Sequence, residues 1–257
     1  MTHPAPIQIH LSKYTTSGEN LRTSSQAQVY RYQKSQATDL FLKIHSGHTD
    51  VLLFREKEAL DWLLGKLPVP RVVAYHETSE AAYLLTEALP GTSSESHPTP
   101  PEATIRILAE GLRAIHAVTA TDCPLPRTTA DDLILRATQN VGSGRVTSQS
   151  LRARGDHRTP GEALHLIQSI RPKSERLALT HGDYCLPNVL IDHTMLSGFV
   201  DWGSAGPGDP HLDLASAQYS IKRNLGDPWV DLFYDLYGRH RIDDQALAFY
   251  VAIYELV

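Results

Sequence analysis

The stretch from Leu177 to Gly203 constrains the fold more strongly than any other part of the sequence. Three short apolar runs lie in it, at Leu177 to Leu179, Val189 to Ile191 and Gly198 to Val200, and polar turns separate them. Short apolar runs bounded by turn residues are typical of buried strands. The sequence therefore predicts three strands in a compact β-turn-β arrangement, with polar side chains at the strand ends.

Three of those polar side chains have the chemistry that phosphoryl transfer needs. Asp183 follows the first run, Asn188 starts the second and Asp201 ends the third. A carboxylate can accept the proton of an attacking hydroxyl, and carboxylate and amide oxygens are ligands for magnesium on nucleotide phosphates. We therefore expect Asp183 to be the catalytic base and Asn188 and Asp201 to be metal ligands.

The residues around these positions form a wider motif. Asn188 follows Asp183 by five residues, as in the catalytic loop of protein kinases, and Asp201-Trp202-Gly203 stands in the place of their Asp-Phe-Gly turn. His181-Gly182 comes directly before Asp183, and Leu186-Pro187 comes directly before Asn188. The segment closely resembles the active site of the antibiotic kinases, in particular the aminoglycoside 3'-phosphotransferases.

The resemblance implies a fold class and a lobe division. The fold is expected to be α+β, of the two-lobed protein-kinase-like type, with a small antiparallel-sheet N-lobe and a larger, mainly helical C-lobe. Residues 1–88 would form the nucleotide-binding lobe and residues 89–257 the catalytic and acceptor-binding lobe of one kinase-like domain. The order of the pieces along the chain follows that of the family, from a lysine strand and a glutamate helix to the catalytic segment.

One lysine lies inside a predicted strand, in Leu40-Phe41-Leu42-Lys43-Ile44. Burying an unpaired ammonium is costly, so this lysine needs a partner. The next segment has apolar residues at helical spacing over residues 51–64 and carries two glutamates. By resemblance to the family, Lys43 would grip the α- and β-phosphates and Glu56 would hold Lys43.

Other residues of the nucleotide half follow from the resemblance. Ser25 lies in a small polar loop without glycine, where the family covers the phosphates. Phe41 resembles the aromatic residue that stacks on adenine, although it could equally be a core residue. The main-chain atoms of Glu87 and Ala88, ahead of a Pro-Gly break, would read the adenine edge. The cofactors would be ATP (or GTP) and Mg²⁺.

The acceptor half departs from the family pattern. Glu255 and Val257 close the chain where the family has acidic residues and a terminal Phe that help to bind the ammonium groups of the drug, and Asp156 lies in the insertion that is often acidic. That insertion carries three arginines between residues 151 and 158 here, and Tyr254 replaces a carboxylate. A polycationic drug is held mainly by carboxylates. We nevertheless expect Glu255, Val257 and Asp156 to be acceptor residues.

Three further segments carry structural expectations. Residues 1–22 are polar and mixed, which indicates an early strand with a loose lead-in. Residues 141–160 are rich in Gly, Ser and Arg and are expected to form a mobile insertion, followed by a short helix at residues 161–170. Asp213, near the start of a predicted helix, is expected to be structural, as a carboxylate that bonds backbone amides.

Composition excludes several classes of protein. In this chain of 257 residues, 41% are hydrophobic, which suits a sizeable core, but no apolar run approaches the roughly 20 residues of a membrane helix. The two cysteines fit a reducing compartment, so a cytoplasmic location without membrane contact is expected. The net charge is −5, and its whole acidic excess lies in residues 91–257, which disfavours nucleic acid. We expect a monomer or weak dimer.

The expected function is that of a small-molecule kinase. The resemblance implies transfer of the nucleotide γ-phosphate to a hydroxyl of an aminoglycoside antibiotic, the 3'-hydroxyl, which would confer antibiotic resistance. Two alternatives stay open: a kinase of another small metabolite or natural product on the same fold, and a nucleotide-binding regulator without turnover. A protein kinase is disfavoured, because no activation-loop and Ala-Pro-Glu pattern follows Asp201.

Overall fold

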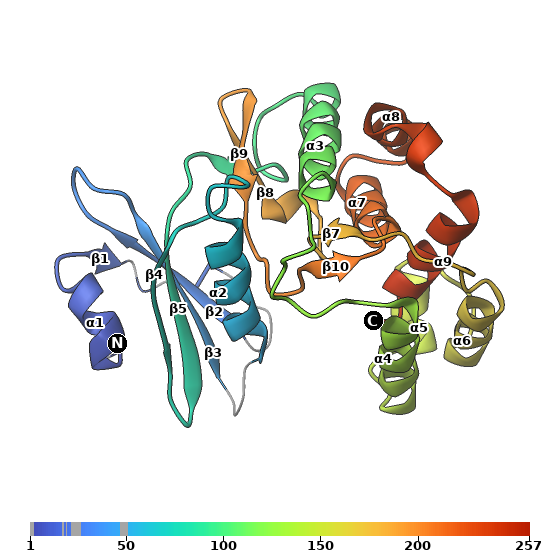
Figure 1. Cartoon of the computed structure of the whole chain (residues 1–257), viewed down its shortest axis with the longest axis horizontal. Coiled ribbons are helices and arrows are strands. Elements are labelled where there is room, and N and C mark those ends of the chain that lie inside the picture. Colours follow the sequence, from blue (N-terminus) through green and yellow to red (C-terminus); the bar gives the residue numbers. More distant parts are fainter. Residues whose placement is uncertain (1–2, 17, 19, 22–26, 47–50) are drawn as a thin grey trace. The chain divides into compact units, whose positions relative to one another are not determined.

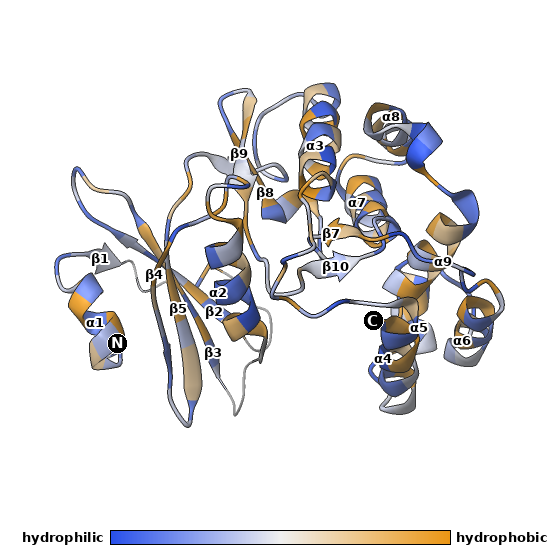
Figure 2. Cartoon of the chain, viewed as in Figure 1, coloured by the Kyte–Doolittle hydropathy of each residue, from blue (hydrophilic) through white to orange (hydrophobic). Residues whose placement is uncertain are grey.

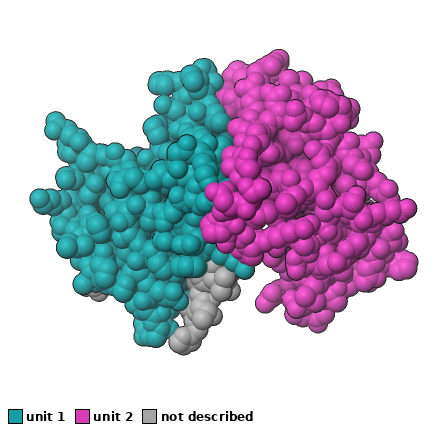
Figure 3. Space-filling view, in the orientation of Figure 1, with its two compact units in different colours: residues 1–93, 189–205 teal, residues 94–188, 206–257 magenta. Residues whose placement is uncertain are grey.

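The structure is a computed structural model that describes residues 3–16, 18, 20–21, 27–46 and 51–257. Two compact units make up the chain: residues 1–93 with residues 189–205, and residues 94–188 with residues 206–257 (Figure 3). The chain therefore passes from the second unit to the first after Asn188 and returns to the second unit after Ala205. Both crossings lie in or next to the segment Leu177 to Gly203, which is called the catalytic segment below. The predicted lobe division at residue 88 stays a prediction.

Unit 1 is built on an antiparallel sheet of five strands, in the order β1-β2-β3-β5-β4 (Figure 1). The strands are β1 Thr15–Thr16, β2 Ala27–Gln33, β3 Leu40–Ser46, β4 Val72–Glu77 and β5 Ala81–Glu87. Alternation along β2 and β3 decides which face is buried, because successive side chains of a strand point to opposite faces. Tyr30, Tyr32, Leu40, Leu42 and Ile44 are accordingly buried in one core.

Helix α2 Val51–Leu63 supplies the predicted glutamate. Leu53, Leu60 and Leu63 recur at helical spacing and are buried, so the helix turns one apolar face inward against β4 and β5. Glu56 is also buried, with only 7% of its surface exposed. A buried carboxylate requires a partner inside the unit.

A second sheet of unit 1 has three strands in the order β6-β8-β9. These strands are β6 Thr92–Ser93, β8 Val189–Asp192 and β9 Met195–Phe199. Gly91, just before β6, has φ +84°, and a side chain there would overlap the carbonyl of Ile191 on β8. The Pro-Gly break in the sequence is therefore a point where two backbones approach too closely for any residue but glycine.

We predict that Gly91→Ala destabilises the protein by about 3 kcal/mol, because it adds a backbone clash to the cost of a positive φ. Gly65→Ala is the matched control, since Gly65 has φ +82° but nothing within 4 Å of the point that a Cβ atom would occupy. The control should lose only about 1 kcal/mol. Urea unfolding midpoints measure both, and equal losses would contradict the close approach at Ile191.

Unit 2 is mainly helical (Figure 1). Its α-helices are α3 Pro101–His116, α4 Ala130–Gly142, α5 Ser148–Ala153, α6 Pro160–Ser169, α7 His211–Asn224, α8 Pro228–Tyr237 and α9 Asp244–Tyr254. Both hydrophobic and hydrophilic residues lie along α3 (Figure 2), and Ile105, Leu108, Leu112 and Ile115 form its buried face. One core joins side chains of α4, α5, α6, α7 and α9. None of the helices in the described residues is long and apolar enough to span a bilayer.

The three apolar runs of the catalytic segment all form strands, but these strands belong to two different sheets. The first run becomes β7 Ala178–Thr180, which pairs with β10 Gly206–Gly208 in unit 2. The other two become β8 and β9 of unit 1. The prediction of a single compact β-turn-β arrangement was therefore wrong, because β7 pairs with β10 and not with β8.

Two other expectations were wrong in part. Residues 1–22 begin with a helix, α1 Ala5–Leu11, because Pro4 sets its start and Ile7 and Leu11 bury one side, and only β1 follows as a strand in the described part of this segment. Residues 141–160 contain helix α5, which begins after the Thr147 cap and buries Leu151 completely. A capping box and one buried leucine outweigh the Gly- and Ser-rich composition on which the expected insertion was based.

Candidate active site

Lys43 on β3 forms two ion pairs inside unit 1. Its Nζ lies 2.7 Å from Glu56 Oε2 on α2 and 2.7 Å from Asp201 Oδ1, two residues after β9. The lysine side chain is 20% exposed and that of Glu56 9%, so both charges are largely removed from water. The structure thus brings Lys43 together with one residue 13 positions away and another 158 positions away in the sequence.

Charge pairing decides the protonation state of Lys43. Burial on its own would lower the pKa of the ammonium, but the neighbouring charges and hydrogen bonds of Glu56 and Asp201 outweigh burial and raise that pKa. Lys43 is therefore a fixed cation at every physiological pH. A fixed cation that keeps part of its surface in contact with solvent is suited to an anionic ligand such as a phosphate group.

The backbone at Asp201 has an uncommon conformation, with φ +68°. Residues other than glycine rarely adopt a positive φ, and such residues cluster at functional sites. The next residue fixes the turn, because Trp202 is completely buried and its Nε1–H donates to the carbonyl of Phe199 at 3.1 Å. Asp201 is thus held at the end of the strand by a buried aromatic anchor.

The other residues predicted for the nucleotide lie on or near the same sheet. Phe41 is partly exposed on β3, opposite Thr86. The backbone N–H of Glu87 donates to Arg71 and that of Ala88 to Asp39, so neither N–H points to a ligand. The main-chain contacts expected at this hinge would therefore come from other atoms than these two N–H groups. Ser25 lies outside the described residues.

In unit 2, Asp183 and Asn188 are joined by side-chain contacts across a short loop. Nδ2 of Asn188 donates to the backbone carbonyl of Asp183 at 2.9 Å and to its Oδ2 at 3.1 Å. The 3-10 helix Leu186–Asn188 closes the loop, and the N–H of Asn188 donates to the carbonyl of Cys185. Because Nδ2 makes these bonds, the amide oxygen Oδ1 is at the opposite end of the group, as an oxygen ligand for a metal would need.

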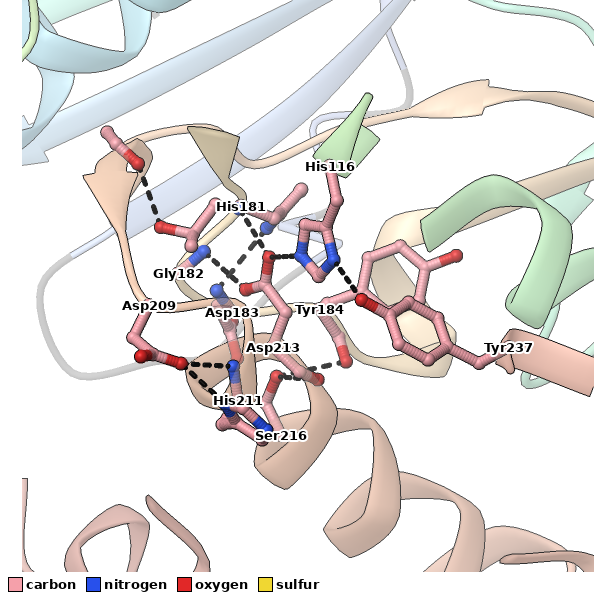
Figure 4. A network of polar contacts seen from close by, with 12 residues as sticks. His116, His181, Gly182, Asp183, Tyr184, Asp209, His211, Asp213, Ser216 and Tyr237 are labelled. Carbon is pink, nitrogen blue, oxygen red and sulfur yellow. Dashed lines mark hydrogen bonds and ion pairs between the residues drawn. The ribbon is translucent and has the colours of Figure 1, made fainter. Parts of the chain in front are cut away.

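Asp213 on α7 holds the start of this loop. Its Oδ2 accepts from the N–H of His181 and its Oδ1 from the N–H of Gly182 (Figure 4), both at 2.8 Å. The Asp213 side chain is 0% exposed. Nε2 of His116 lies 3.1 Å from the same carboxylate, and its Nδ1 lies 2.8 Å from the Tyr237 hydroxyl. The expected structural role of Asp213 is confirmed, but the amides belong to the catalytic segment and not to its own helix.

Further buried contacts fix the rest of the loop. The Tyr184 side chain is fully buried, and its hydroxyl donates to the carbonyl of Leu108 on α3. The N–H of Leu186 donates to Ser220 Oγ on α7, and the carbonyl of Leu186 accepts from Ser94 Oγ. The loop that carries Asp183 is therefore tied to α3 and to α7, which preorganises the carboxylate.

The residues predicted for the acceptor also lie in unit 2, and Arg158 joins them. The guanidinium Nε of Arg158 donates to both carboxylate oxygens of Asp156, at 2.8 and 3.0 Å, and its backbone N–H donates at 2.9 Å. Burial alone would raise the pKa of Asp156, but these bonds lower it overall. Asp156 is thus an ionised carboxylate that is already neutralised by an arginine of its own loop.

Glu255 ends α9 beside this pair. Burial raises the pKa of Glu255, and the charge of Asp156 adds to the effect. Its Oε2 is buried, and the neighbouring Asp156 carboxylate is itself an acceptor, so a bond between the two needs a shared proton. Arg154 donates to the carbonyl of Glu255 at 3.3 Å. Val257 packs against the apolar core of unit 2 and is partly buried.

An aromatic pair lies near this cluster and near Asp183. The rings of Tyr219 and Tyr254 are 5.5 Å apart, and the guanidinium of Arg154 lies 5.8 Å from the Tyr219 ring. Burial raises the pKa of Tyr254, and the charge of Asp183 raises it further, so the Tyr254 hydroxyl stays protonated near the carboxylate. Two aromatic rings and the Arg154 guanidinium thus lie together in this part of unit 2.

The protein groups that could hold a metal are few. No cluster of three His, Cys, Asp or Glu side chains in the described residues is arranged to hold a metal by itself. Asn188 and Asp201 offer one amide oxygen and one carboxylate. Magnesium in nucleotide sites commonly takes only one or two protein ligands, and phosphate oxygens and water supply the rest. The chemistry of these two side chains fits a magnesium ion that arrives with a nucleotide.

A model of the phosphotransferase enzyme family matches residues 20–250 of the chain. The chain belongs to this family. An aminoglycoside 3'-phosphotransferase of Niallia circulans is 36% identical over 230 residues, which are 88% of this chain and 87% of that relative. One of Streptomyces fradiae is 36% identical over 205 residues, or 76% of each chain.

A solved structure has the same fold. The crystal structure of an aminoglycoside-3'-phosphotransferase of type VIII covers 98% of this chain and 98% of its own, with a TM-score of 0.80 and 28% identity. The predicted protein-kinase-like α+β fold and the resemblance to the aminoglycoside 3'-phosphotransferases are therefore confirmed, and this family member is a phosphotransferase. The assignment of individual residues rests on the geometry described above.

Sequence reasoning missed several residues that support the site. His116 lies on α3, and its contacts with Asp213 and Tyr237 come from segments about 100 residues away, which the sequence does not indicate. Ser220 gave no signal at all. The three arginines of the 151–158 segment were noticed, but not that Arg158 would bind Asp156. The only hint in the sequence is that Arg158 follows Asp156 by two positions.

Proposed function

We propose that this protein transfers the γ-phosphate of ATP or GTP to a hydroxyl of an aminoglycoside, the 3'-hydroxyl, and so confers resistance to such antibiotics. The observation that carries the proposal is the Lys43 ammonium, held at 2.7 Å by both Glu56 and Asp201. Protein kinases bind nucleotide phosphates with a strand lysine that a glutamate holds in place, and they also carry a catalytic loop with an Asp and an Asn. This chain has such a lysine and, in Asp183 and Asn188, such a loop. The relatives named for this activity support the acceptor.

Each residue then has a defined task. Asp183 orients the acceptor hydroxyl and accepts its proton, and the Asp213 contacts keep the loop of Asp183 in one conformation. Lys43 pairs with the α- and β-phosphates, and Glu56 keeps its ammonium in place. Asn188 and Asp201 would hold magnesium, which neutralises charge on the phosphates when bound. Catalysis on this account is positioning and charge stabilisation.

The test is nucleotide consumption in the presence of magnesium, with mass spectrometry of the product. Kanamycin, neomycin and other aminoglycosides serve as acceptors, and a reaction without acceptor measures background hydrolysis. We expect acceptor-dependent consumption and a product heavier by one phosphate group. Tight nucleotide binding without any modified aminoglycoside would overturn the acceptor assignment and leave the phosphotransferase half intact.

We predict that Lys43→Met lowers kcat/KM for the nucleotide by about 10²-fold or more, because it removes a fixed charge from the phosphates. Lys57→Met on α2 is the matched control, since Lys57 pairs with Glu58 and Asp61 of its own helix. Lys43→Met also leaves Glu56 buried without its ammonium. The double variant Lys43→Met/Glu56→Gln removes that charge, and activity near the wild-type level in the folded double variant would contradict the role of Lys43.

A second candidate function keeps the chemistry and changes the acceptor to another small metabolite or natural product. The observation that favours it is the pairing of Asp156 with Arg158, since a carboxylate that already binds a guanidinium is less available to an ammonium group. Arg154 and the two tyrosines add to the difference, because they add a cation and two aromatic rings to the part of unit 2 that contains Glu255. Such surroundings suit an acceptor with fewer amino groups.

Arg158→Gln separates the two candidates. If the acceptor is polycationic, we expect its KM to fall by about fivefold with little change in kcat, because the freed Asp156 carboxylate gains roughly 1 kcal/mol with an ammonium. Arg152→Gln on α5 is the control in the same segment and should leave KM unchanged. A rise in KM for Arg158→Gln would mean that the guanidinium itself contacts the acceptor, and it would support the second candidate.

A further inference from the structure

A cavity of about 140 Å³ lies in unit 2, apart from the residues assigned to nucleotide and acceptor. It is bounded by the C-terminal end of α3, the segment that leads into β7, and the segments next to α7 and α8. Its lining residues are Arg113, His116, Ala117, Arg176, Leu177, Ala178, Pro210, Tyr237 and Arg241. None of these nine described residues is acidic.

Three arginines from three separate segments line this cavity. Arg113 comes from α3, Arg176 from the lead-in to β7, and Arg241 from the 3-10 helix after α8. Within the described part of the chain, no carboxylate lies at ion-pair distance from any of the three. Arg176 instead donates through Nη1 to the backbone carbonyl of Arg241, which ties the lead-in of β7 to the 3-10 helix after α8.

The two nearby carboxylates form no ion pair with these guanidiniums, because their oxygens accept hydrogen bonds from other groups. Asp213 accepts from His116 and from the N–H groups of His181 and Gly182. Asp209 accepts from the ring and N–H of His211, and its Oδ2 accepts from the backbone N–H of Arg176. Both are buried, whereas the arginines are exposed, so an anion from solution can reach the guanidiniums.

Size selects the class of anion. Pockets that enclose drug-sized ligands have volumes of about 300–1,000 Å³. A cavity of about 140 Å³ is too small for a nucleotide and large enough for one tetrahedral oxyanion. Guanidinium groups bind phosphate oxygens by charge-assisted, often bidentate hydrogen bonds. The Tyr237 hydroxyl and the His116 ring add polar edges, and Leu177 and Pro210 add an apolar one.

We propose that this cavity is a phosphate-binding site, separate from the nucleotide residues, in which Arg113, Arg176 and Arg241 hold one tetrahedral oxyanion. The occupant is either free inorganic phosphate or the phosphate group of a small monoester. Its wall is linked to the catalytic segment, since His116 contacts both Tyr237 and Asp213 (Figure 4). The proposal does not depend on the identity of the acceptor.

The test is a titration of the full-length protein with sodium phosphate, with sodium chloride at the same ionic strength as the reference. Calorimetry gives the affinity, and ¹H–¹⁵N spectra of the arginine Nε–Hε groups report the place. We expect saturable phosphate binding that shifts the resonances of Arg113, Arg176 and Arg241. The double variant Arg113→Gln/Arg176→Gln should bind at least about tenfold more weakly, which is ~1.4 kcal/mol.

Two controls separate this site from others. Arg106 lies on α3, like Arg113, and pairs with Glu102. The variant Arg106→Gln should therefore bind phosphate as the wild type does. Lys43→Met should also keep the binding, because Lys43 belongs to the nucleotide residues. A parallel titration with glycerol 3-phosphate distinguishes the two possible occupants. If glycerol 3-phosphate binds as tightly as inorganic phosphate, the site accepts a phosphate monoester; if it binds more weakly, the occupant is free phosphate.

Three results would overturn the proposal. One is the absence of binding beyond that of chloride. Another is unchanged affinity in the folded double variant. The third is loss of binding in Lys43→Met, which would place the phosphate with the nucleotide residues instead.

Discussion

Replacement of Asp183 by Asn is expected to lower kcat for phosphoryl transfer by about 10²–10⁴-fold, the usual contribution of a positioned general base. The Asn side chain keeps the size of the carboxylate and can still accept the 3.1 Å hydrogen bond from Asn188 Nδ2. It cannot accept a proton from the acceptor hydroxyl. The loop conformation should therefore survive while the chemistry is lost.

The control for this variant is Asp192→Asn, at the end of β8, where the carboxylate has no assigned catalytic task. Both variants should unfold at the wild-type urea concentration and bind the nucleotide with unchanged affinity. Steady-state rates over a range of acceptor concentrations separate kcat from KM. Full turnover in folded Asp183→Asn would remove Asp183 from the role of base and direct attention to another group near the acceptor.

The largest effect on stability is expected at Asp213. Asp213→Ala leaves the N–H groups of His181 and Gly182 without this acceptor in a site that is 0% exposed, and it also removes the carboxylate from Nε2 of His116. Loss of one member of a buried charged network costs about 3–5 kcal/mol. We therefore expect the urea midpoint to fall steeply.

Asp213→Asn tests the cause of that loss. The amide keeps one acceptor oxygen, so about half of the lost stability should return, whereas a purely steric effect of Ala would also be repaired by Leu. Asp231→Asn on α8 is the control, since that side chain is 83% exposed and should change stability by less than about 0.5 kcal/mol. Equal stability of Asp213→Ala and the wild type would contradict the anchoring of the catalytic segment.

The sequence allowed the chemistry to be predicted better than the scaffold that holds it. The pair of Lys43 and Glu56 could be predicted because a lysine inside an apolar strand demands a carboxylate partner, and the family resemblance indicated Glu56. Asp201 was predicted only as a metal ligand, and its ion pair with Lys43 comes from the structure. The structure places all three within ion-pair distance. The assignment of their roles, like that of Asp183 and Asn188, stays a prediction until variants are measured.

The errors have a common physical origin. The pairing of β7 with β10, instead of with β8, depends on which backbone supplies the hydrogen bonds, and local apolar patterns carry no information about this. Helix α5 was missed because Thr147 and Leu151 decide it, while composition averaged over 20 residues hides a single cap and a single buried side chain. Long-range contacts such as that of His116 with Asp213 have no signature in one sequence.

The most direct test of the account is transfer to a matched pair of aminoglycosides that differ only in the presence of the 3'-hydroxyl. With magnesium and ATP or GTP, we expect the wild type to add one phosphate to the 3'-hydroxy compound and none to its 3'-deoxy analogue, and NMR of the product should place the phosphate on the 3' oxygen. Phosphorylation of both compounds at the same rate, or of neither, would contradict the proposed function.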